Sequence, residues 1–333
     1  MNSYLVRASA LQGYRETVLE LGGDPEMLMA QVGLPSVDTD PEAWVSYGAY
    51  LQLLENTADS LGCAHFGLHL SQRQNIDILG AVGFIIQQAP DIRTALHELS
   101  QYFSHHNQGA SVSTTVENDV TLWAFSAKPR QNSPMRQQSD LVAGIAVNVM
   151  RFLYAGWKPT AIYLPHSAPA DTRPYRKLFD CPVYFNWDRT VIASDAAILD
   201  IPLSEANPQL HRLLETHLTE LQQSFPDDYS AQVSYLIKQA LLTGDCSIER
   251  VSSFLAVNKR TLQRKLQAQG LSYKQLQDAV RFEIARNYLR ETSGSLTGLA
   301  HMLCYSELSA FSNAFRHHHG VSPRAWKKQA AIA

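Results

Sequence analysis

The sequence contains few cysteines and no cysteine pair. Its four cysteines, Cys63, Cys181, Cys246 and Cys304, are scattered along 333 residues without any C-x-x-C spacing. This distribution excludes a disulfide framework and a zinc finger, and it is typical of a cytoplasmic protein whose thiols stay reduced. We expect the four cysteines to be small core residues.

Long apolar runs are also missing. The longest nearly uninterrupted run, from Ile78 to Ile86, is far shorter than the roughly 20 residues that a bilayer-spanning helix needs. Glu16 and Glu20 fall within the N-terminal helical pattern, so we expect no signal peptide. With 45% hydrophobic and 18% charged residues, the composition is that of a soluble globular chain of two or three domains.

Motifs for catalysis and for metal binding are absent from the sequence. It contains no nucleophile elbow, phosphate-binding loop or zinc-protease signature. His317, His318 and His319 are adjacent, and because neighbours on a helix point about 100° apart, they cannot converge on one ion. His105 and His106, near a helix end, are predicted to be a polar cap or a surface pair. We predict no catalytic residue, no metal site and no cofactor.

Charge is distributed unevenly between the two ends of the chain. Residues 1–228 contain 14 Lys and Arg against 25 Asp and Glu, a net charge of −11. Residues 229–333 contain 14 against 6, a net charge of +8. A basic domain next to an acidic one is typical of nucleic-acid binding, although a basic helical surface can also face an acidic protein or a lipid.

The basic third contains the same helical unit twice. Each copy has a capping residue, a short helix, a turn, a second cap and a longer helix that ends at a glycine. The first copy uses Ser247, the apolar face Ile248, Val251 and Leu255, the cap Asn258, the face Leu262 and Leu266, and Gly270; the second uses Ser295, Leu296, Leu299, Leu303, Ser306, Phe311, Phe315 and Gly320. Corresponding apolar positions lie 48 residues apart in the first helices and 49 in the second. The pattern predicts two helix-turn-helix units.

Between the two copies, the spacing of apolar residues predicts a long helix. It runs from about Tyr273 to Arg290, which at 1.5 Å per residue corresponds to roughly 27 Å. Two helix-turn-helix units reach neighbouring major grooves when their recognition helices lie about 34 Å apart. A rigid spacer of this length suits that geometry.

The acidic two-thirds of the chain is predicted to be α+β. Residues 4–105 have helical periodicity, and the alternation on both sides of Glu117-Asn118-Asp119 predicts a hairpin. A helix over about 137–155, a strand near 161–164, a short helix near 172–179 and strands around 183–185 and 191–193 follow. Helices followed by a mainly antiparallel sheet indicate an α+β N-terminal domain, and the C-terminal domain is expected to be all-α. The expected division is a sensing and dimerisation domain over 1–205, a helical linker over 206–228 and a DNA-binding domain over 229–333.

The C-terminal 100 residues also carry a recognisable pattern. It consists of Arg281–Arg290, Ser295-Leu296, Phe311, Phe315 and Gly320-Val321-Ser322-Pro323. In these residues the chain resembles the AraC/XylS transcription regulators. Residues 306–312 are similar to the subgroup that includes ornithine-utilisation regulators, and shorter strings such as Leu79-Gly80-Ala81-Val82-Gly83 extend the similarity into the N-terminal half.

The resemblance implies a groove-facing set of residues on each recognition helix. These are Arg260, Gln263 and Arg264 in the first unit and Leu308, Ser309, Ser312 and Asn313 in the second. Arg pairs bidentately with guanine and Gln with adenine, so the first unit is expected to specify sequence and the second mainly to position the protein. The implied phosphate contacts are Lys259, Lys265, Arg316, Lys327 and Lys328.

Three positions of the second copy depart from the family pattern. Cys304 stands where the family usually has glycine, Gly298 lies inside a helix, and Asn313 replaces a frequent Arg. Because glycine lowers helix stability by about 0.5–1 kcal/mol relative to alanine, the second unit is expected to be the weaker one.

These observations predict a sequence-specific DNA-binding transcription regulator and no enzyme activity. The resemblance implies an activator that binds double-stranded DNA, works with RNA polymerase, forms a homodimer and senses a small-molecule effector, such as a metabolite or a fatty acid, through its N-terminal domain. The sequence identifies no effector-binding residue. Two alternatives stay open: an enzyme acting on a small molecule with a basic regulatory C-terminal module, and a constitutive DNA binder without an effector.

Overall fold

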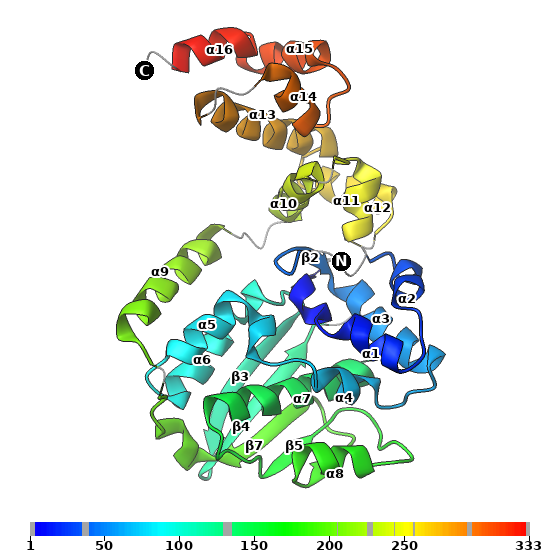
Figure 1. The fold of residues 1–333 in the computed structure, drawn as a ribbon, viewed down its shortest axis with the longest axis vertical. Coiled ribbons are helices and arrows are strands. Elements are labelled where there is room, and N and C mark those ends of the chain that lie inside the picture. Colours follow the sequence, from blue (N-terminus) through cyan, green and yellow to red (C-terminus); the bar gives the residue numbers. More distant parts are fainter. Residues whose placement is uncertain are drawn as a thin grey trace. The chain divides into compact units, whose positions relative to one another are not determined.

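The chain forms two compact units, residues 1–224 and residues 225–333, whose elements are labelled in Figure 1. The computed structural model describes residues 4–34, 40–128, 135–204, 206–224, 229–242, 244–255, 257–291 and 295–330. Among these residues, no helix is long and apolar enough to cross a membrane.

Short helices make up the N-terminal half of the first unit. Its elements are β1 (Leu5–Arg7), η1 (Ala8–Leu11), α1 (Tyr14–Glu20), α2 (Pro25–Gln31), β2 (Trp44–Ser46), α3 (Tyr47–Ser60), α4 (Phe66–Ser71), η2 (Ile76–Leu79), α5 (Ala81–Gln88), α6 (Ile92–Tyr102) and η3 (Phe103–His105). Asp24, Ser46 and Asp91 cap α2, α3 and α6, each accepting a hydrogen bond from the backbone N–H three residues on. Strands β1 and β2 pair antiparallel, and the sequence does not predict them because three residues are too few to show alternation.

A five-stranded sheet forms the other half of the first unit. The elements are β3 (Ala110–Glu117), β4 (Val120–Ala127), α7 (Arg136–Leu153), β5 (Ala161–Tyr163), α8 (Arg173–Phe179), β6 (Val183–Tyr184), β7 (Thr190–Asp195) and η4 (Ala196–Asp200). The strand order is β3-β4-β7-β5-β6, and every pair is antiparallel except β5 with β6. The predicted α+β class with a mainly antiparallel sheet is confirmed.

The turn between β3 and β4 is built from Asn118 and Asp119. Their φ angles are 49° and 63°, a left-handed conformation that Asn and Asp tolerate better than most residues. Positive φ at both central residues gives a hairpin turn whose twist matches that of the strands. Glu117 and Val120 are accordingly opposite each other in the register, and the predicted hairpin is confirmed.

Helix α7 packs against α4 on one side and contacts strand β7 of the sheet on another. Glycines at the α4–α7 contact let the two backbones approach closely. A Cβ atom on Gly67 would lie 2.2 Å from the carbonyl oxygen of Gln137, and one on Gly144 would lie 2.1 Å from Ser71 Oγ. The Gly67 amide also donates a hydrogen bond to Gln137 Oε1 at 2.9 Å. These contacts fix α7 as a wall facing the sheet (Figure 1).

Helix α9 (Pro208–Ser224) packs against α5 and belongs to the first unit. Leu218 on α9 is fully buried in the core of that unit. His211 Nε2 donates a hydrogen bond to Glu98 Oε1 on α6 at 2.6 Å. The described part of the range expected to be a linker, 206–228, is therefore anchored on the N-terminal unit.

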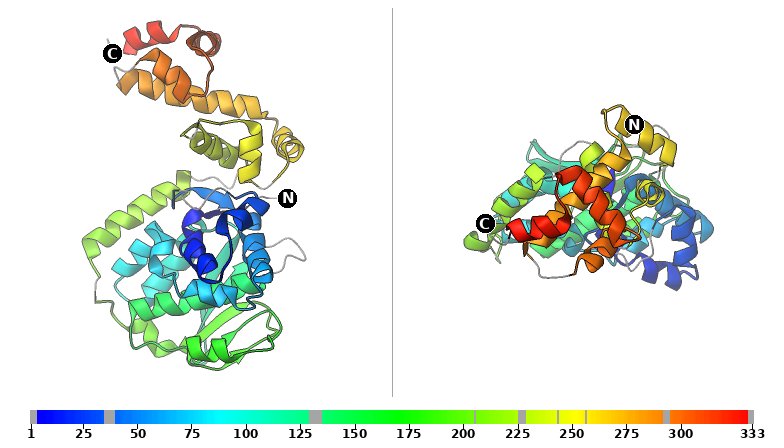
Figure 2. Two further views of the ribbon diagram at one scale, coloured as in Figure 1. Left: turned by 45° about the vertical axis from the view of Figure 1, so that its right-hand side comes forward. Right: turned by 90° about the horizontal axis from the view of Figure 1, so that it is seen from above.

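The second unit is all-helical, as predicted. Its elements are α10 (Tyr229–Leu242), α11 (Ile248–Phe254), α12 (Lys259–Gln267), α13 (Tyr273–Glu291), α14 (Leu296–Met302), α15 (Leu308–His319) and α16 (Pro323–Ala330). The left view of Figure 2 shows α13 as a long golden-orange helix with α11 and α12 at one end and α14 and α15 at the other.

Three of the four predicted caps in this unit are confirmed. Ser247 Oγ, Asn258 Oδ1 and Ser295 Oγ accept hydrogen bonds from backbone N–H groups of the helices that follow. Ser306 is not a cap, and that prediction is wrong. Helix α15 starts two residues later, with Glu307 in extended conformation as its N-cap, and the Glu307 side chain accepts no capping hydrogen bond from a backbone N–H of the helix.

The prediction that all four cysteines are core residues is also only partly correct. Cys246 is buried, whereas Cys63, Cys181 and Cys304 are half-buried. Cys304 has a φ of 57°, so it adopts the left-handed conformation for which glycine is the usual residue. The position where the family pattern has glycine is thus a position that demands positive φ.

We predict that Gly67→Ala destabilises the first unit by about 1–3 kcal/mol, because the added methyl group meets backbone that cannot move aside. The free energy of unfolding is measured by urea denaturation of the full chain followed by tryptophan fluorescence. Gly48→Ala is the control, since a Cβ at this exposed glycine of α3 has only Ser46 Oγ nearby, at 3.8 Å. Equal losses in both variants would contradict the close-approach argument.

Candidate functional site

Helix α12 separates its apolar and polar residues onto opposite sides. Leu262 and Leu266 are fully buried, whereas Arg260, Gln263 and Arg264 are exposed. Residues three and four apart lie on one face of a helix, so these three side chains form one surface. The structure therefore brings the three predicted base-reading residues of the first helix-turn-helix unit together on an accessible helix face.

Helix α15 repeats this arrangement with shorter side chains. Phe311 and Phe315 are fully buried. On the other side Ser309 and Asn313 are exposed, while Leu308 and Ser312 are half-buried. Ser309 Oγ donates a hydrogen bond to Glu307 Oε2 at 3.0 Å, and Asn313 Oδ1 accepts one from Arg316 Nη2 at 3.2 Å. The outer face of α15 is thus polar but offers less reach than that of α12.

The predicted phosphate-binding residues differ in their surroundings. Lys259 is exposed and forms an ion pair with Glu249 at 2.7 Å, and Lys265 is half-buried with its ammonium group 4.5 Å from the ring centre of Tyr229. Arg316 is exposed and Lys327 is half-buried. The side chain of Lys328 lies outside the described residues.

Arg281 on α13 joins the two helix-turn-helix units. Its Nη2 atom donates hydrogen bonds to Cys246 Sγ, just before α11, and to the carbonyl oxygen of Cys304, in the turn after α14, both at 3.2 Å. The guanidinium group also lies 4.5 Å from the ring centre of Tyr305. Tyr273 and Gln277 of the same helix donate to the Cys246 carbonyl oxygen at 2.9 and 2.6 Å. Helix α13 therefore contacts both the residues just before the first helix-turn-helix unit and the turn of the second one.

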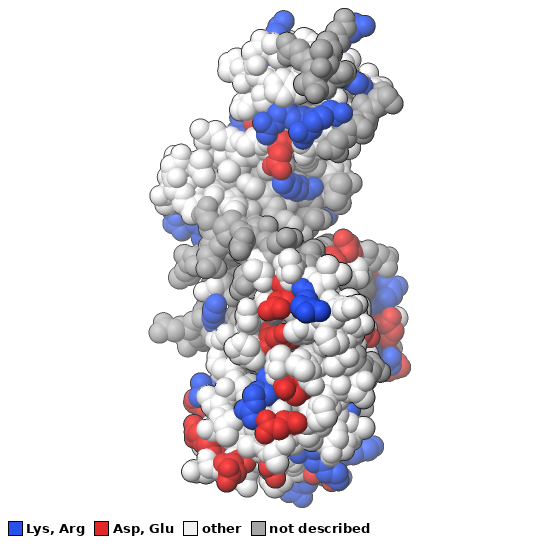
Figure 3. All heavy atoms as spheres, turned by 90° about the vertical axis from the view of Figure 1, so that its left-hand side faces the viewer, with Lys and Arg blue, Asp and Glu red and all other residues white. Residues whose placement is uncertain are grey.

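Lys and Arg side chains dominate the charged surface of the second unit. On the face drawn in Figure 3, the second unit displays more basic than acidic side chains, whereas the first unit interleaves the two signs. This agrees with the net charges of −11 for residues 1–228 and +8 for residues 229–333. A basic helical surface of this kind attracts the phosphate backbone of nucleic acids.

Two of the three adjacent histidines, His318 and His319, pack on aromatic rings. His318 stacks on Phe282 with ring centres 4.5 Å apart, and His319 lies 4.5 Å from Phe315 and 5.1 Å from Trp326. Among the described residues, no cluster of three or more His, Cys, Asp or Glu is placed to hold a metal ion. In the described part of the chain, these histidines therefore contribute to the packing around α15.

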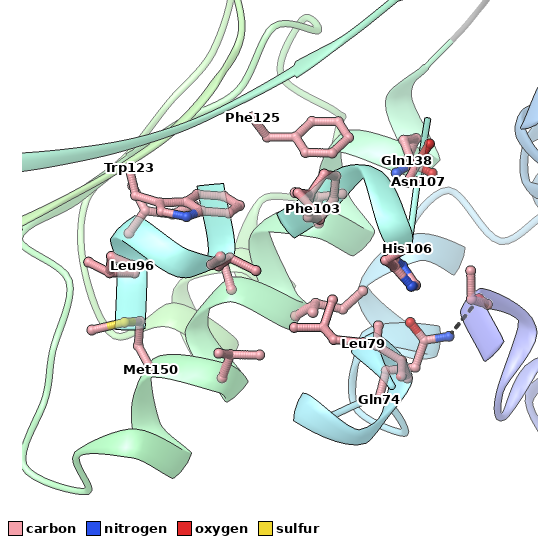
Figure 4. Close-up of a pocket in the computed structure, with 18 of the residues that line it drawn as sticks. Gln74, Leu79, Leu96, Phe103, His106, Asn107, Trp123, Phe125, Gln138 and Met150 are labelled. Carbon is pink, nitrogen blue, oxygen red and sulfur yellow. Dashed lines mark hydrogen bonds between the residues drawn. The ribbon is translucent and has the colours of Figure 1, made fainter. Parts of the chain in front are cut away.

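The first unit encloses a cavity of about 80 Å³ between the sheet and the helices α6 and α7. Strands β4 and β7 contribute Thr121, Trp123, Phe125, Ile192 and Ser194. Figure 4 shows Trp123, Leu96 and Met150 on one side, and Gln74, His106, Asn107 and Gln138 on the other. The cavity is therefore largely apolar, with a group of amides and an imidazole at one end.

His105 and His106 are both buried, which corrects the prediction of a surface pair. The segment that contains them runs alongside β1, and the Arg7 amide donates a hydrogen bond to the His106 carbonyl oxygen at 2.9 Å. Burial, together with the nearby Arg7 charge, lowers the pKa of His106 from 6.5 to about 4. His106 is therefore neutral at physiological pH where it lines the cavity.

Comparisons with known proteins agree with this arrangement. A family model described as the arabinose-binding domain of AraC transcription regulators matches residues 22–203, and one described as a helix-turn-helix domain matches residues 251–329. The chain is 28% identical to the HTH-type transcriptional regulator VirS of Mycobacterium tuberculosis, over 99% of this chain and 98% of that protein. It is 22% identical to the ornithine utilization regulator of Pseudomonas aeruginosa, over 97% and 96%. The crystal structure of the transcriptional regulator CdpR from Pseudomonas aeruginosa aligns with a TM-score of 0.44 and 21% identity, over 91% and 96%.

The two helix-turn-helix units and the α+β domain define a transcription regulator with a DNA-binding domain and an N-terminal domain of the ligand-binding type. Because the N-terminal family model matches more than half of the chain, the protein belongs to the AraC family of transcription regulators. The two curated relatives named above are regulators as well. The chain is therefore a transcription regulator.

Sequence reasoning predicted the helices α12 and α15 but no residue of the cavity. One signal was available, because alternation along β4 places Thr121, Trp123 and Phe125 on the same face of the sheet. No pattern in the sequence predicts that Gln74 and Gln138 line the cavity. They come from segments 64 residues apart that meet only in the folded unit.

The lowered pKa of His106 predicts acid sensitivity of the first unit. Because the folded-state pKa lies below the unfolded value, this residue's contribution to stability is complete above about pH 6.5 and is lost as the pH falls toward 4. We expect a loss of about 2 kcal/mol between pH 7 and pH 5. His106→Gln should remove this part of the pH dependence, measured as unfolding free energy at both pH values. If the wild-type protein loses no more unfolding free energy between pH 7 and pH 5 than the variant does, the prediction is wrong.

The contacts of Arg281 predict that it supports the second unit without touching DNA. Arg281→Ala should lower the unfolding free energy of this unit by about 1.5–3 kcal/mol, because two hydrogen bonds from a charged donor are lost. Arg286→Ala removes the same charge from an exposed position of the same helix and should change stability by less than about 0.5 kcal/mol. Thermal unfolding of the full chain measures both, and equal effects would show that only the charge matters.

Proposed function

We propose that this chain is a sequence-specific transcription activator that binds double-stranded DNA through α12 and α15 and responds to a small molecule bound in its N-terminal domain. The observation that carries the proposal is that α12 and α15 have the same arrangement of apolar and polar residues. Each helix buries an apolar pair, Leu262 with Leu266 or Phe311 with Phe315, and turns a polar face outward. Helix α13 is 19 residues and about 28 Å long. It separates the two helix-turn-helix units by a distance that suits adjacent major grooves.

Base recognition is assigned mainly to α12. The exposed Arg260 and Arg264 suit guanine, and Gln263 suits adenine. In the proposal, Leu308, Ser309, Ser312 and Asn313 of α15 make shorter contacts that position the protein more than they specify sequence. The ion pair of Lys259 with Glu249 and the stacking of Lys265 on Tyr229 are arrangements that DNA phosphates would compete with.

The proposed domain assignment keeps the boundaries expected from the sequence. We assign effector sensing and dimerisation to residues 1–205, the connection to residues 206–228 and DNA binding to residues 229–333. The packing of α9 on α5 supports a connector that is anchored on the sensing domain. A change in that domain would therefore reach the connector directly.

A cavity inside the N-terminal domain favours an effector-responsive regulator over a constitutive DNA binder. Protein interiors are close-packed, and voids that hold several water-sized atoms are few in one domain. Ornithine appears in the name of one relative. Ornithine carries an α-carboxylate and two ammonium groups, whereas no Asp, Glu, Lys or Arg lines this cavity, so we do not extend that effector to this chain.

A homodimer that works with RNA polymerase in the cytoplasm completes the proposal. Two chains would place four recognition helices on one operator, which raises affinity without new kinds of contact. The measurement is the mass of the full chain in solution, with and without operator DNA. A monomer under both conditions would contradict the dimer.

The base assignment predicts a difference between two substitutions. On a DNA site selected from a random pool by the wild-type protein, Arg264→Ala should cost about 1–3 kcal/mol and relax the preference at one base pair. Lys327→Ala, the comparison variant, should weaken selected and random DNA alike and lower the slope of log affinity against log salt by about 0.9 for the lost phosphate contact. Equal losses for both variants on both DNAs would show the groove assignment to be wrong.

A further inference from the structure

Buried polar atoms without a hydrogen-bond partner gather around the cavity of the first unit. Among the described residues they include Gln74 Oε1, His106 Nδ1, Thr121 Oγ1, Gln138 Oε1 and Trp157 Nε1. All five residues line this cavity, and each side chain is more than nine-tenths buried. Folded proteins pair nearly all of their buried polar groups, so this concentration indicates groups that an occupant of the cavity would satisfy.

The hydrogen-bonding roles of two of these groups are fixed. Gln74 Nε2 donates to the carbonyl oxygens of Ala10 and Gln12, at 3.0 and 2.8 Å, which leaves Gln74 Oε1 as an acceptor. Figure 4 shows this amide beside His106, with its bond to Ala10 dashed. Trp157 Nε1 can only donate. Trp157 follows the C-terminal end of α7, whereas Gln138 lies in the first turn of that helix, so the two ends of the cavity present separate polar groups. A group that satisfies Gln74 Oε1 must carry a hydrogen-bond donor.

Charge is absent from the cavity wall. No Asp, Glu, Lys or Arg is among the residues that line the cavity, and burial keeps the His106 imidazole neutral. A charged occupant would lose its hydration and gain no counter-ion, which is strongly unfavourable in an apolar interior. The lining therefore selects against both carboxylates and ammonium groups.

The apolar side of the cavity determines the chemistry of the rest of the occupant. Leu96, Phe103, Trp123 and Met150 face it from α6, η3, β4 and α7 (Figure 4). The cavity volume of about 80 Å³ is well above what one water needs, so the cavity can hold an organic molecule. The occupant therefore has an apolar body and a polar end.

We propose that the effector of this regulator is an uncharged molecule, with an apolar body against Trp123 and Met150 and a hydroxyl or carboxamide group at the end formed by Gln74, His106 and Gln138. The inference rests on the proposed function, in which this domain is the sensor. It deepens that function by naming the chemical class of the effector.

Matched pairs of small molecules test the class. Cyclopentanol is compared with cyclopentylammonium, and cyclopentanecarboxamide with cyclopentanecarboxylate, by isothermal titration into the full-length protein at pH 7.5. We expect the uncharged member of each pair to bind at least tenfold more tightly. Trp123 and Trp157 line the cavity, so tryptophan fluorescence should change with the same dissociation constant.

Two residues at opposite ends of the cavity provide a control for the location. Gln138 and Thr121 both line the cavity and both have a buried oxygen without a partner, but Gln138 lies beside Asn107 at the polar end, whereas Thr121 precedes Trp123 on β4. Gln138→Leu should weaken cyclopentanol binding at least threefold, and Thr121→Val should leave it unchanged. Equal effects of the two substitutions would overturn the placement of the hydroxyl group at the polar end.

The inference and the proposed function fail in different ways. Equal or tighter binding of the charged members, or binding by none of the four molecules because the cavity holds ordered water alone, would overturn the inference. The effector role is tested separately with Ala146→Leu, which adds volume to the cavity wall on α7. If this variant unfolds at the wild-type temperature, no longer binds cyclopentanol and yet leaves reporter transcription unaltered, the effector role is lost while the specificity of the cavity stands.

Discussion

The hydrogen bonds of Arg281 set the relation between the two helix-turn-helix units. One guanidinium group reaches Cys246 before the first unit and the Cys304 carbonyl oxygen in the turn of the second. The recognition helices follow these two points closely along the chain, so their spacing depends on α13 staying attached at both. Coulombic attraction between protein and DNA falls off with salt, whereas this internal connection is partly buried and less screened.

The close approach of α7 to α4 has a comparable role in the N-terminal unit. Gly67 and Gly144 remove the side chains that would hold the two backbones apart. Helix α7 is thereby fixed on one side, and its other side forms the cavity wall that includes Gln138, Ala146 and Met150. A cavity persists because the surrounding elements are held by contacts elsewhere and cannot collapse into it.

Much of the fold follows from local patterns in the sequence. The helix-turn-helix repeat, the hairpin at Asn118-Asp119 and the exposed face of α12 were predictable, since each depends on residues near one another in the chain. The failures have non-local causes. Helix α15 starts at Leu308 and not after a Ser306 cap, and the pair His105-His106 is buried because β1 covers it. The cavity depends on segments from six or more elements, and no periodicity reveals how they meet.

The neutral lining of the cavity has a consequence for signalling in a living cell. Its only imidazole has a pKa of about 4, and burial raises the pKa of its one phenol, Tyr50, far above neutrality. No group in the wall changes its protonation state between pH 6 and pH 8. An uncharged signal bound by such a wall would keep the same affinity when the pH inside the cell shifts within that range.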